Sequence, residues 1–424
     1  MISRYRSWVI LAGVFLAWFM VGGVQTFTLF IAPWRKEFGW SLSAMSLAAS
    51  VQYMVNGLFG PFGGRLADRF GSKRVFLGYL FVLGLGALAA SRMTSVWHLV
   101  LVQGVMFGVA SGLSPVYSPL LARWFPRHRG MAFAIAPSGH HLGRGAFAPI
   151  VVSLITVAGW RVPWLLFGGL ILFILIPLVL VTFRDNPEDQ LSDRLSATRQ
   201  SGGSTASSPP SGARDEGAAV LEAVRTSPFW LIFAGFLVCG STAQPITVHL
   251  APLAMEGGLG QAETAAALGI FGISALLGLL TSGAATETIG GRGTLATYYL
   301  SRAVGFLVLL FFLTSGHPWA LYLASGIIGF FGRGTDPAVR TLLANCYGVR
   351  SLGTLVGLVL MIHQLGSAFW IFMGGYLFQH TGTYAGFLIT SVVMLVVASI
   401  ISCYIRERRC YPVPEEELQP VRVG

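Results

Sequence analysis

Charged side chains are scarce in this sequence, and their scarcity excludes an ordinary soluble protein. Only 11% of the 424 residues are charged, whereas 54% are hydrophobic. Soluble domains contain about 25% charged residues. Apolar runs of about 18 to 25 residues recur along the chain, and each is long enough to cross a bilayer as a helix. The sequence therefore predicts an all-α integral membrane protein.

Cysteine is also scarce, and one common nucleotide-binding motif is missing. The chain has four cysteines, and no two of them form a C-x-x-C pair. This pattern argues against both a disulfide framework and a zinc site. No phosphate-binding loop of the form G-x-x-x-x-G-K-[ST] occurs, which argues against ATP hydrolysis. We expect no metal and no cofactor.

Twelve apolar segments make up most of the chain. Sequence patterns place the boundaries of such segments only to within about two to four residues. The segments cover approximately residues 8–32, 43–64, 74–91, 97–122, 130–158, 162–183, 229–253, 263–287, 294–314, 319–342, 352–378 and 383–405. An even number of crossings places both termini on the same side of the membrane.

Positive charge is distributed unevenly among the connecting segments. The chain carries 28 Lys and Arg residues and 17 Asp and Glu residues. With the N-terminus in the cytoplasm, the cytoplasmic segments hold 20 of the 28 basic residues and the external loops hold four. Membrane proteins retain positive charge in their cytoplasmic loops. We therefore expect a multi-pass protein of the inner (plasma) membrane with both termini cytoplasmic, and we read the basic residues as topology signals rather than as a nucleic-acid surface.

A polar stretch divides the twelve segments into two sets of six. Its sequence, "SGGSTASSPPSGARDEG", is rich in Ser, Gly and Pro and cannot build a hydrophobic core. The predicted organisation is a first six-helix bundle at residues 1–183, a flexible cytoplasmic linker at 184–228, a second bundle at 229–405 and a cytoplasmic tail at 406–424.

The two halves are related by an internal repeat. Pro33 aligns with Pro252, and the same spacing of 219 residues pairs Gln25 with Gln244. Further along, "SGLSPVYSPLLA" aligns with "RGTDPAVRTLLA" at a spacing of 222, and "HHLG" aligns with "HQLG" at 223. Two related six-helix bundles with a binding site between them, near the midplane, form one known transporter architecture.

The motif "GGRLADRFGSKRV", after the second apolar segment, resembles the signature loop of the major facilitator superfamily. The resemblance implies twelve transmembrane helices in two pseudo-symmetric bundles and a cytoplasmic latch between conformations. Its Asp can cap a helix and pair with basic residues. The predicted latch residues, with their second-half counterparts, are Gly64, Asp68, Arg69, Gly71, Lys73, Arg74, Glu287 and Arg292.

Within that superfamily, three longer stretches resemble the monocarboxylate porter and oxalate/formate antiporter branch. They are "LFIAPWRKEFGWSLSAMSLAAS", "LLARWFPRHRGMAFAIAPSGHHLG" and "VGLVLMIHQLGSAFWIFMGGYLFQHTGTYAGF". The chain departs from that branch in two places. The eighth segment lacks the Arg and Asp, and the first lacks the buried Lys, that monocarboxylate porters use. These departures argue against a simple lactate or pyruvate porter.

Ionisable groups inside the apolar segments are candidates for substrate binding or coupling. In "RGTDPAVR", Asp336 follows Arg333 by three residues and precedes Arg340 by four, so all three share one helical face. The carboxylate can pair with either guanidinium, and Arg340 is expected at the membrane interface. The pattern leaves open whether Arg333 and Asp336 form a substrate site or a structural gate.

Two histidines and an arginine form a second candidate group. His140 and Arg144 share a helical face, and His363 is the repeat counterpart of His140. Arg144 can pair with a carboxylate, and the histidines can donate hydrogen bonds or accept protons. Each histidine could instead bond a backbone carbonyl. Matching positions on the first and seventh segments make Gln25 and Gln244 further candidates.

Three other groups are expected to lie outside the site. His141 faces another side of its helix and is expected to be structural. His249 is expected to be either an interfacial residue or a gate. Arg302 is expected to extend its side chain to the cytoplasm.

These observations predict a secondary active transporter that moves a small organic anion, most simply a carboxylate, by alternating access. Coupling to protons or exchange for another anion is expected. The alternative is an exporter of a drug or secondary metabolite, which the missing charges of the eighth segment favour. The expected partners are the substrate, a proton or counter-anion, and the lipid bilayer, with the monomer as the functional unit. No enzymatic activity is expected, because no second catalytic cluster accompanies His140 or His141.

Overall fold

The computed structural model describes residues 2–40, 42–185 and 217–407, and all twelve predicted segments fall in helices there. The described residues form no strand, although Gly217 and Gly348 make an isolated bridge. Most of the predicted linker and most of the predicted tail lie outside the described residues.

The first half contains the helices of segments one to six. Two of its stretches, η2 and η3, are π-helical, and η1 is a 3₁₀ helix. The elements are α1 (Ile2–Val24), η1 (Phe27–Phe30), α2 (Ile31–Phe38), α3 (Leu42–Phe70), α4 (Ser72–Ala90), α5 (Val96–Leu99), η2 (Val100–Met106), α6 (Phe107–Ala110), α7 (Leu113–Trp124), α8 (Arg129–Ala158), α9 (Arg161–Gly169), η3 (Leu170–Leu175) and α10 (Ile176–Thr182).

The second half contains the helices of segments seven to twelve, preceded by one short helix. That helix, α12, lies within the stretch predicted as a flexible linker. The elements are α12 (Val220–Val224), α13 (Ser227–Glu256), α14 (Gln261–Ser315), α15 (Pro318–Arg333), α16 (Thr335–Tyr347), α17 (Leu352–Thr381) and α18 (Ala385–Cys403).

Nine helical stretches of the described chain are long and apolar enough to cross a membrane, and they cover ten of the twelve predicted segments. There are fewer such stretches than predicted segments partly because α14 joins two segments across a kink at Gly290, whose φ is 78°. The tenth segment is divided into α15 and α16 at Gly334. The second segment, α3, is the other one outside the nine.

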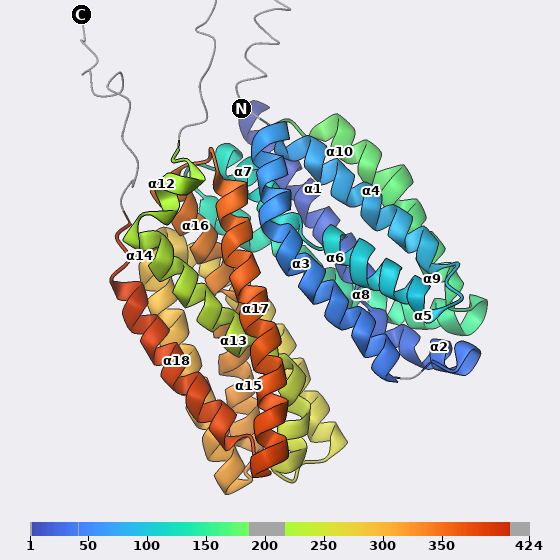
Figure 1. Ribbon diagram of the computed structural model, residues 1–424, viewed down its shortest axis with the longest axis vertical. Coiled ribbons are helices and arrows are strands. Elements are labelled where there is room, and N and C mark those ends of the chain that lie inside the picture. Colours follow the sequence, from blue (N-terminus) through green and yellow to red (C-terminus); the bar gives the residue numbers. More distant parts are fainter. Residues whose placement is uncertain (1, 41, 186–216, 408–424) are drawn as a thin grey trace, which may run out of the picture.

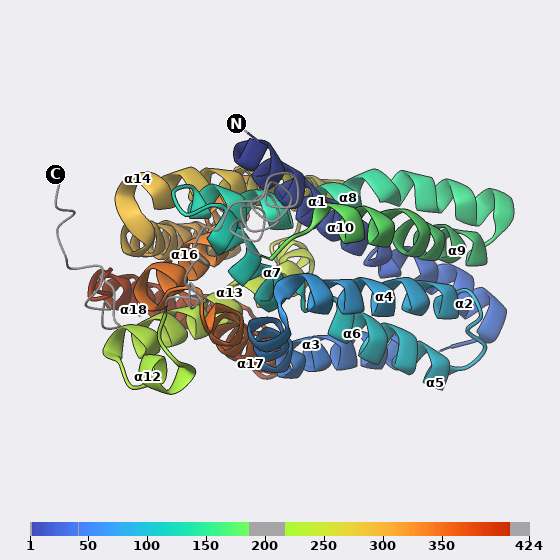
Figure 2. The ribbon, with the colours of Figure 1, turned by 90° about the horizontal axis from the view of Figure 1, so that it is seen from above.

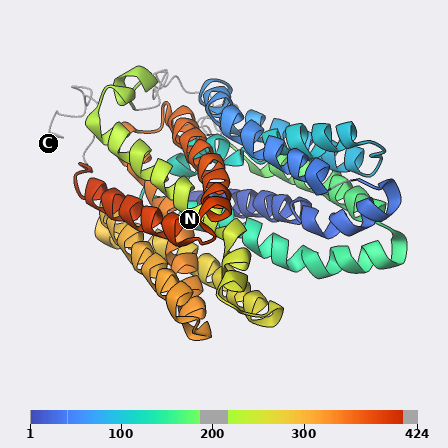
Figure 3. The same ribbon diagram turned by 60° about the horizontal axis from the view of Figure 1, so that its bottom comes forward.

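The helices form two bundles that lie side by side, with the first half in one and the second half in the other (Figure 2). The same division is visible when the lower end is turned toward the viewer (Figure 3). In Figure 1 the ribbons converge at the end that carries the start of α1 and the short helix α12, and diverge toward the opposite end. We call these the terminal end and the distal end.

The principal contacts between the bundles join α3, α7 and α8 to α14, α16 and α17. Glycines bring the backbones of α3 and α17 together: a Cβ on Gly64 would lie 2.0 Å from the Gly353 carbonyl oxygen. Gly60 and Gly357 meet in the same way. Small residues at helix crossings permit such close approach in membranes. The terminal end is therefore held by direct backbone packing.

Glycine also fixes two predicted site residues against neighbouring helices. A Cβ on Gly22 of α1 would lie 2.2 Å from the His140 carbonyl oxygen, so α1 and α8 are in close contact at that residue. In the second bundle, a Cβ on Gly240 of α13 would lie 2.0 Å from the His363 carbonyl oxygen. The repeat thus places one histidine of each half at a tight helix crossing.

Candidate functional site

A hydrogen-bonded cluster at the centre of the first bundle joins three of its helices. Gln25 lies directly after α1, Ser111 lies directly after α6, and His140 lies on α8. The Gln25 Nε2 donates to the Ser111 Oγ at 2.9 Å, and the Gln25 Oε1 lies 2.9 Å from the His140 Nε2. Two of the predicted site residues, Gln25 and His140, are therefore direct neighbours.

The cluster continues through two glutamines that the sequence analysis did not single out. The Gln52 Nε2 on α3 donates to the Ser111 Oγ at 3.5 Å, and the Gln103 Nε2 donates to the Gln52 Oε1 at 2.9 Å. Gln103 is buried within the π-helix η2, and π-helical turns are frequent at functional sites. The sequence signal that could have identified these two glutamines is the presence of an amide side chain within an apolar segment.

In the second bundle, the positions equivalent to Gln25 and Ser111 hold a different hydrogen-bonded pair, Gln244 and Arg333. The Arg333 Nη2 donates to the Gln244 Oε1 at 3.0 Å. Gln244 is the counterpart of Gln25, and Arg333 is the counterpart of Ser111. Among the described residues, no carboxylate lies within salt-bridge distance of Arg333. Its direct hydrogen-bond partner is therefore a neutral amide, while Asp336 and Cys239 act on its charge from farther away.

One arginine from each bundle acts on the same pair of histidines. The charges of Arg144 and Arg333 both reach the imidazoles of His140 and His141. The two histidine rings lie 5.4 Å apart, so His141, expected to be structural, belongs to the same group. Arg144 is exposed, whereas His140, His141 and Arg333 are half-buried. We call His140, His141, Arg144 and Arg333 the central cationic cluster.

Asp336 pairs with Arg340 rather than with Arg333. Arg340 also donates to the hydroxyls of Tyr117 and Ser114 on α7. Its side chain is only 4% exposed, because α7 of the other bundle covers it. The position of Arg340 at the membrane interface stays a prediction.

His363 is not hydrogen-bonded to the group around His140. Its Nδ1 lies 3.2 Å from the Gln364 Oε1, and its ring lies against Phe236 at 4.7 Å. The Gln364 Nε2 in turn donates to the Asn56 Oδ1 on α3, at 3.1 Å. His363 is therefore linked to the contact between the bundles through its neighbour.

The other two groups placed outside the site are both buried. His249 contacts the Tyr384 hydroxyl at 3.3 Å and the Ile371 carbonyl oxygen at 3.0 Å. Arg302 is 0% exposed, so the prediction that it extends to the cytoplasm is wrong. Its Nη1 donates instead to the Gly332 carbonyl oxygen, at 3.1 Å, inside the second bundle.

Asp68, the acidic residue of the signature loop, binds the N-terminus of α17 on the other bundle. Its Oδ1 accepts from the Gly353 backbone N–H at 2.9 Å. Its Oδ2 accepts from the backbone N–H and the hydroxyl of Thr354 at 2.7 and 2.6 Å. Carboxylates are favourable at helix N-termini, where backbone N–H groups are unpaired. Asp68 therefore joins the two bundles at the terminal end.

Glu287, the repeat counterpart of Asp68, makes the corresponding contact in the opposite direction. Its Oε1 accepts from the Met131 backbone N–H at 3.0 Å, in the first turn of α8. Its Oε2 lies 3.1 Å from the His128 Nδ1. Each bundle thus contributes one carboxylate to a helix N-terminus of the other.

The remaining predicted latch residues do not make such bridges. The Lys73 backbone N–H donates to the Asp185 Oδ1 at 2.8 Å, within the first bundle. Gly71, at φ 89°, shapes the turn before this contact. Gly64 acts through its close approach to α17. Three exposed arginines, Arg69, Arg74 and Arg292, complete the predicted set.

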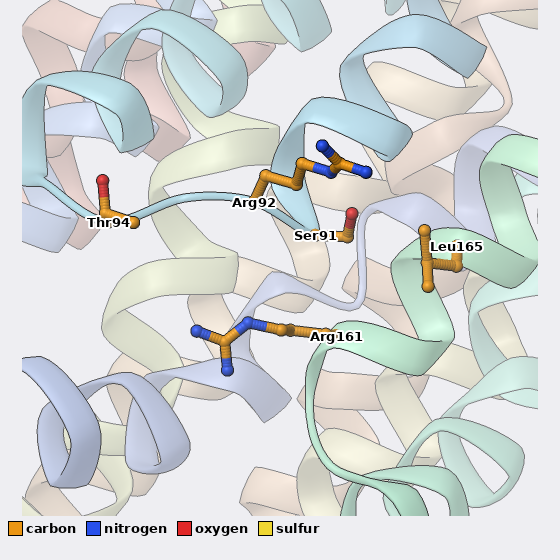
Figure 4. A pocket seen from close by; sticks show the side chains of 5 residues that line it. All are labelled: Ser91, Arg92, Thr94, Arg161 and Leu165. Carbon is orange, nitrogen blue, oxygen red and sulfur yellow. The ribbon is translucent and has the colours of Figure 1, made fainter.

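A shallow hollow of about 290 Å³ opens near the distal end of the first bundle. Figure 4 shows its lining residues, Ser91, Arg92, Thr94, Arg161 and Leu165. The Arg161 Nη2 is paired with the Glu37 Oε1 at 2.6 Å. No predicted site residue lines this hollow, so we do not place the substrate there.

Comparison with known families accounts for this arrangement. The sequence model of the Major Facilitator Superfamily matches residues 11–282 and 250–422. The chain belongs to the Major Facilitator Superfamily. Its two six-helix bundles, its repeat and its signature loop are those of a transporter of this superfamily.

Relatives place the transporter near the monocarboxylate branch. It is 25% identical to monocarboxylate transporter 13 of Bos taurus, over 97% of this chain and 92% of that protein. It is also 25% identical to monocarboxylate transporter 12 of Mus musculus, over 98% of this chain and 89% of that protein. An uncharacterized MFS-type transporter of Bacillus subtilis (strain 168), YcxA, is 22% identical over 89% of each chain.

Solved structures share the fold. A variant of the E. coli fucose:proton symporter FucP superposes with a TM-score of 0.66 at 16% identity, covering 93% of this chain and 97% of that one. A FucP structure described as being in the outward conformation gives the same TM-score and identity, and covers 95% and 99% of the two chains. At this identity the likeness shows the fold alone.

Proposed function

We propose that this transporter moves a small organic anion, most simply a carboxylate, by alternating access between the two bundles. The observation that carries the proposal is the central cationic cluster, to which both bundles contribute. Arg333 has no carboxylate partner among the described residues, and Arg144 is exposed. An anion bound between these groups would supply the missing negative charge.

The neighbouring amides suit the same substrate. A guanidinium can bind a carboxylate through two parallel hydrogen bonds. Gln244 already holds the Arg333 guanidinium, and Gln25 holds His140. These bonds reduce the freedom of the charged groups before the substrate binds, and such preorganisation favours affinity.

The donor and acceptor directions of the hydrogen bonds around Gln25 favour His140 as the proton-coupling residue. The Gln25 Nε2 is used as a donor to Ser111, so its Oε1 is the acceptor that faces His140. The His140 Nε2 then carries the proton, and its Nδ1, which has no hydrogen-bond partner among the described residues, can accept another. An anion beside Arg144 and Arg333 would offset their repulsion of a protonated His140. Substrate and proton would therefore bind cooperatively, by thermodynamic linkage.

The contacts between the bundles support an outward-facing state. The terminal end is closed by Asp68 and Glu287, and the ribbons diverge at the distal end (Figure 1). With both termini in the cytoplasm of a cell with an inner (plasma) membrane, the divergent end faces outward. Release into the cytoplasm would then require both carboxylate contacts to break.

Thermal unfolding of the purified transporter with a panel of ligands tests the proposal. The panel contains mono- and dicarboxylates, sugars, lipophilic cations and bulky neutral compounds, at about pH 5.5 and pH 7.5, on either side of the ordinary titration range of histidine. A ligand at 100 times its dissociation constant stabilises the native state by about 2.7 kcal/mol. We expect a carboxylate to stabilise the wild type, more strongly at the lower pH.

Matched arginine variants locate the binding site. Arg144→Gln should abolish the stabilisation by the carboxylate, whereas Arg92→Gln, at the exposed hollow of Figure 4, should retain it. If only cations or bulky neutral compounds stabilise the protein, the anion proposal fails and export of a drug or secondary metabolite replaces it.

A further inference from the structure

A fully buried arginine in the second bundle lacks an evident counter-charge. Arg302, on α14, is 0% exposed. Its Nη1 donates to the Gly332 carbonyl oxygen, but its Nε and Nη2 make no hydrogen bond to any described residue. Among the described residues, no carboxylate lies within salt-bridge distance of it. A buried charge without compensation is strongly unfavourable.

The nearest group able to carry a negative charge is a cysteine. The Cys239 Sγ on α13 lies 3.8 Å from the Arg302 Nη1 and 3.0 Å from the Thr335 Oγ1. Cys239 is itself buried, at 3% exposure. The His363 imidazole on α17 also contacts this sulfur. Polar side chains from three other helices therefore converge on one thiol, and two of them, Arg302 and Thr335, can donate a hydrogen bond to it.

The charges around Cys239 are predominantly positive. Arg302 and Arg333 both act on it electrostatically, and His363 faces it from α17. Among the described residues a further ionisable neighbour is the Tyr299 phenol, whose hydroxyl donates a hydrogen bond to the Gly235 carbonyl oxygen. Burial opposes ionisation of the Cys239 thiol, whereas the nearby cationic groups favour the thiolate.

The internal repeat shows that the fold does not require this polar pair. At the spacing of 219 residues, Arg302 corresponds to Leu83 and Cys239 corresponds to Met20. Tyr79 and Tyr298, four residues earlier on the same two helices, correspond at this spacing, so the register is secure. The first bundle fills the equivalent place with two apolar side chains. The pair is thus specific to the second bundle.

We propose that Cys239 is ionised in the native protein and forms a buried thiolate–guanidinium ion pair with Arg302. The thiol loses its proton to water, and the sulfur then accepts hydrogen bonds from Arg302 and Thr335. The ion pair ties α13, α14, α16 and α17 together behind Arg333. It also makes Cys239 the site at which a small thiol-directed electrophile would modify this bundle. The inference does not depend on the proposed substrate.

Infrared spectroscopy tests the ionisation directly, because only a protonated thiol has an S–H stretching band. The measurement uses the full chain with Cys346→Ser, Cys403→Ser and Cys410→Ser, so that Cys239 is the one remaining cysteine. We expect no S–H band from the native protein at about pH 7, below the ordinary pKa of about 8.5 for a cysteine thiol. Denaturation at the same pH should make the band appear, and Cys239→Ala gives the blank. A band from the native protein would overturn the proposal.

Replacing Arg302 and Cys239 by the residue types at the equivalent positions of the first bundle gives a second, independent test of the ion pair. Arg302→Leu and Cys239→Met should each lower the midpoint of thermal unfolding, because each leaves one member of the pair unmatched. The double variant reproduces the pair found at Leu83 and Met20, and should regain at least half of the summed loss. Losses that simply add would show that the two residues are not coupled, and would contradict the ion pair.

Discussion

At the scale of single residues, Arg333 determines the charge at the centre of the molecule. It stands at the repeat position that Ser111 holds in the first bundle. Ser111 accepts a hydrogen bond from Gln25, whereas Arg333 donates one to Gln244. Hydroxyl and guanidinium thus fill equivalent places with opposite hydrogen-bonding roles. Serine is therefore the substitution that removes the charge while fitting the fold.

We expect Arg333→Ser to abolish stabilisation by the bound carboxylate without lowering the stability of the ligand-free protein. The variant removes a guanidinium that has no carboxylate within salt-bridge distance among the described residues and that interacts with Asp336 and Cys239 only from farther away. Burial of a charge without a direct partner does not favour folding. Thermal unfolding with and without the carboxylate measures both effects. Full stabilisation of the variant would contradict a substrate-binding role for Arg333.

Unlike Arg333→Ser, the variant Arg340→Ser should lower the stability of the ligand-free protein. Arg340 is paired with Asp336 and donates to Tyr117 and Ser114 of the other bundle. Its loss leaves the Asp336 carboxylate without its partner, and breaking such a pair costs about 3 kcal/mol. We expect a clear fall in the unfolding midpoint of the ligand-free protein. A midpoint equal to that of the wild type would show that this bridge adds nothing to stability.

The Glu37 carboxylate gives a pH prediction outside the membrane-spanning segments. Hydrogen bonds from Arg161 and then Trp160 lower the pKa of Glu37 below its ordinary value of 4.5. The contribution of the ionised Glu37 to the stability of the folded protein is therefore complete above the ordinary pKa. It is lost as the pH falls through the lowered pKa. The effect should be small because the pair is exposed. Unfolding midpoints of the wild type and Glu37→Gln should converge at acid pH and be separate at neutral pH.

At the scale of elements, the bundles are joined at the terminal end by carboxylates on helix N-termini. Asp68 accepts from the first turn of α17, and Glu287 accepts from the first turn of α8. Each contact makes use of backbone N–H groups that have no partner inside their own helix. Sequence and fold agree here, because the repeat that aligns the two acidic residues also aligns the two helices that they bind.

Asp68→Asn should favour separation of the bundles at the terminal end. The variant keeps one oxygen acceptor but loses the charge, which weakens its attraction to the helix N-terminus. Distances between spin labels at the start of α17 and the end of α3 should show a larger population of long separations. Glu263→Gln is the matched control, because Glu263 caps its own helix at the Gly260 N–H. Equal distance distributions in Asp68→Asn and the control would contradict the latch.

A comparison of two glycines tests the close helix crossing. A Cβ on Gly64 would meet the Gly353 backbone, whereas a Cβ on Gly78 of α4 would meet no atom within 4 Å. We expect Gly64→Ala to separate α3 from α17 in the spin-label experiment. Gly78→Ala should leave the distances unchanged and slightly favour helix formation. Similar behaviour of the two variants would show that the crossing is not limited by backbone contact.

Helices were more predictable from the sequence than the contacts of individual side chains. The twelve segments follow from apolar runs, which any bilayer-spanning helix needs, and the repeat follows from aligned motifs. The burial of Arg302 and the bridge made by Arg340 depend on which helices lie beside them, and residue depth does not report this. The π-helical setting of Gln103 has no local sequence signal. The roles of the candidate site residues remain predictions that the proposed experiments test.

At the scale of the whole molecule, the backbone symmetry of the two bundles is accompanied by a marked asymmetry of charge. The second bundle carries Arg302, Arg333 and the Asp336–Arg340 pair at positions where the first carries Leu83 and serines. The first bundle contributes one arginine, Arg144, together with neutral amides and histidines. A substrate between them would therefore contact chemically different walls, so it would bind in one orientation.

The symmetric latch predicts that its two halves act together on the conformational equilibrium. Asp68→Asn and Glu287→Gln disturb contacts on different pairs of helices, and the effects of separate sites generally add. We expect the double variant to populate separated terminal ends about as the summed single free-energy changes predict. Spin-label distances across both contacts provide the measurement. A double variant no more open than either single variant would show that one contact alone controls closure.

The glycine faces of α3 and α17 bear on how quickly the transporter can change state. At Gly60, Gly64, Gly353 and Gly357 the two helices meet through backbone atoms, with no side chain from any of these positions inserted into the opposite helix. Parting the helices there requires no withdrawal of interlocked side chains and no change of rotamer. The two helix surfaces can therefore slide or separate at these four glycines without steric hindrance from side chains. The barrier to opening should then come mainly from the hydrogen bonds between the bundles, at the helix ends and at Arg340 and Gln364, which water can replace one at a time.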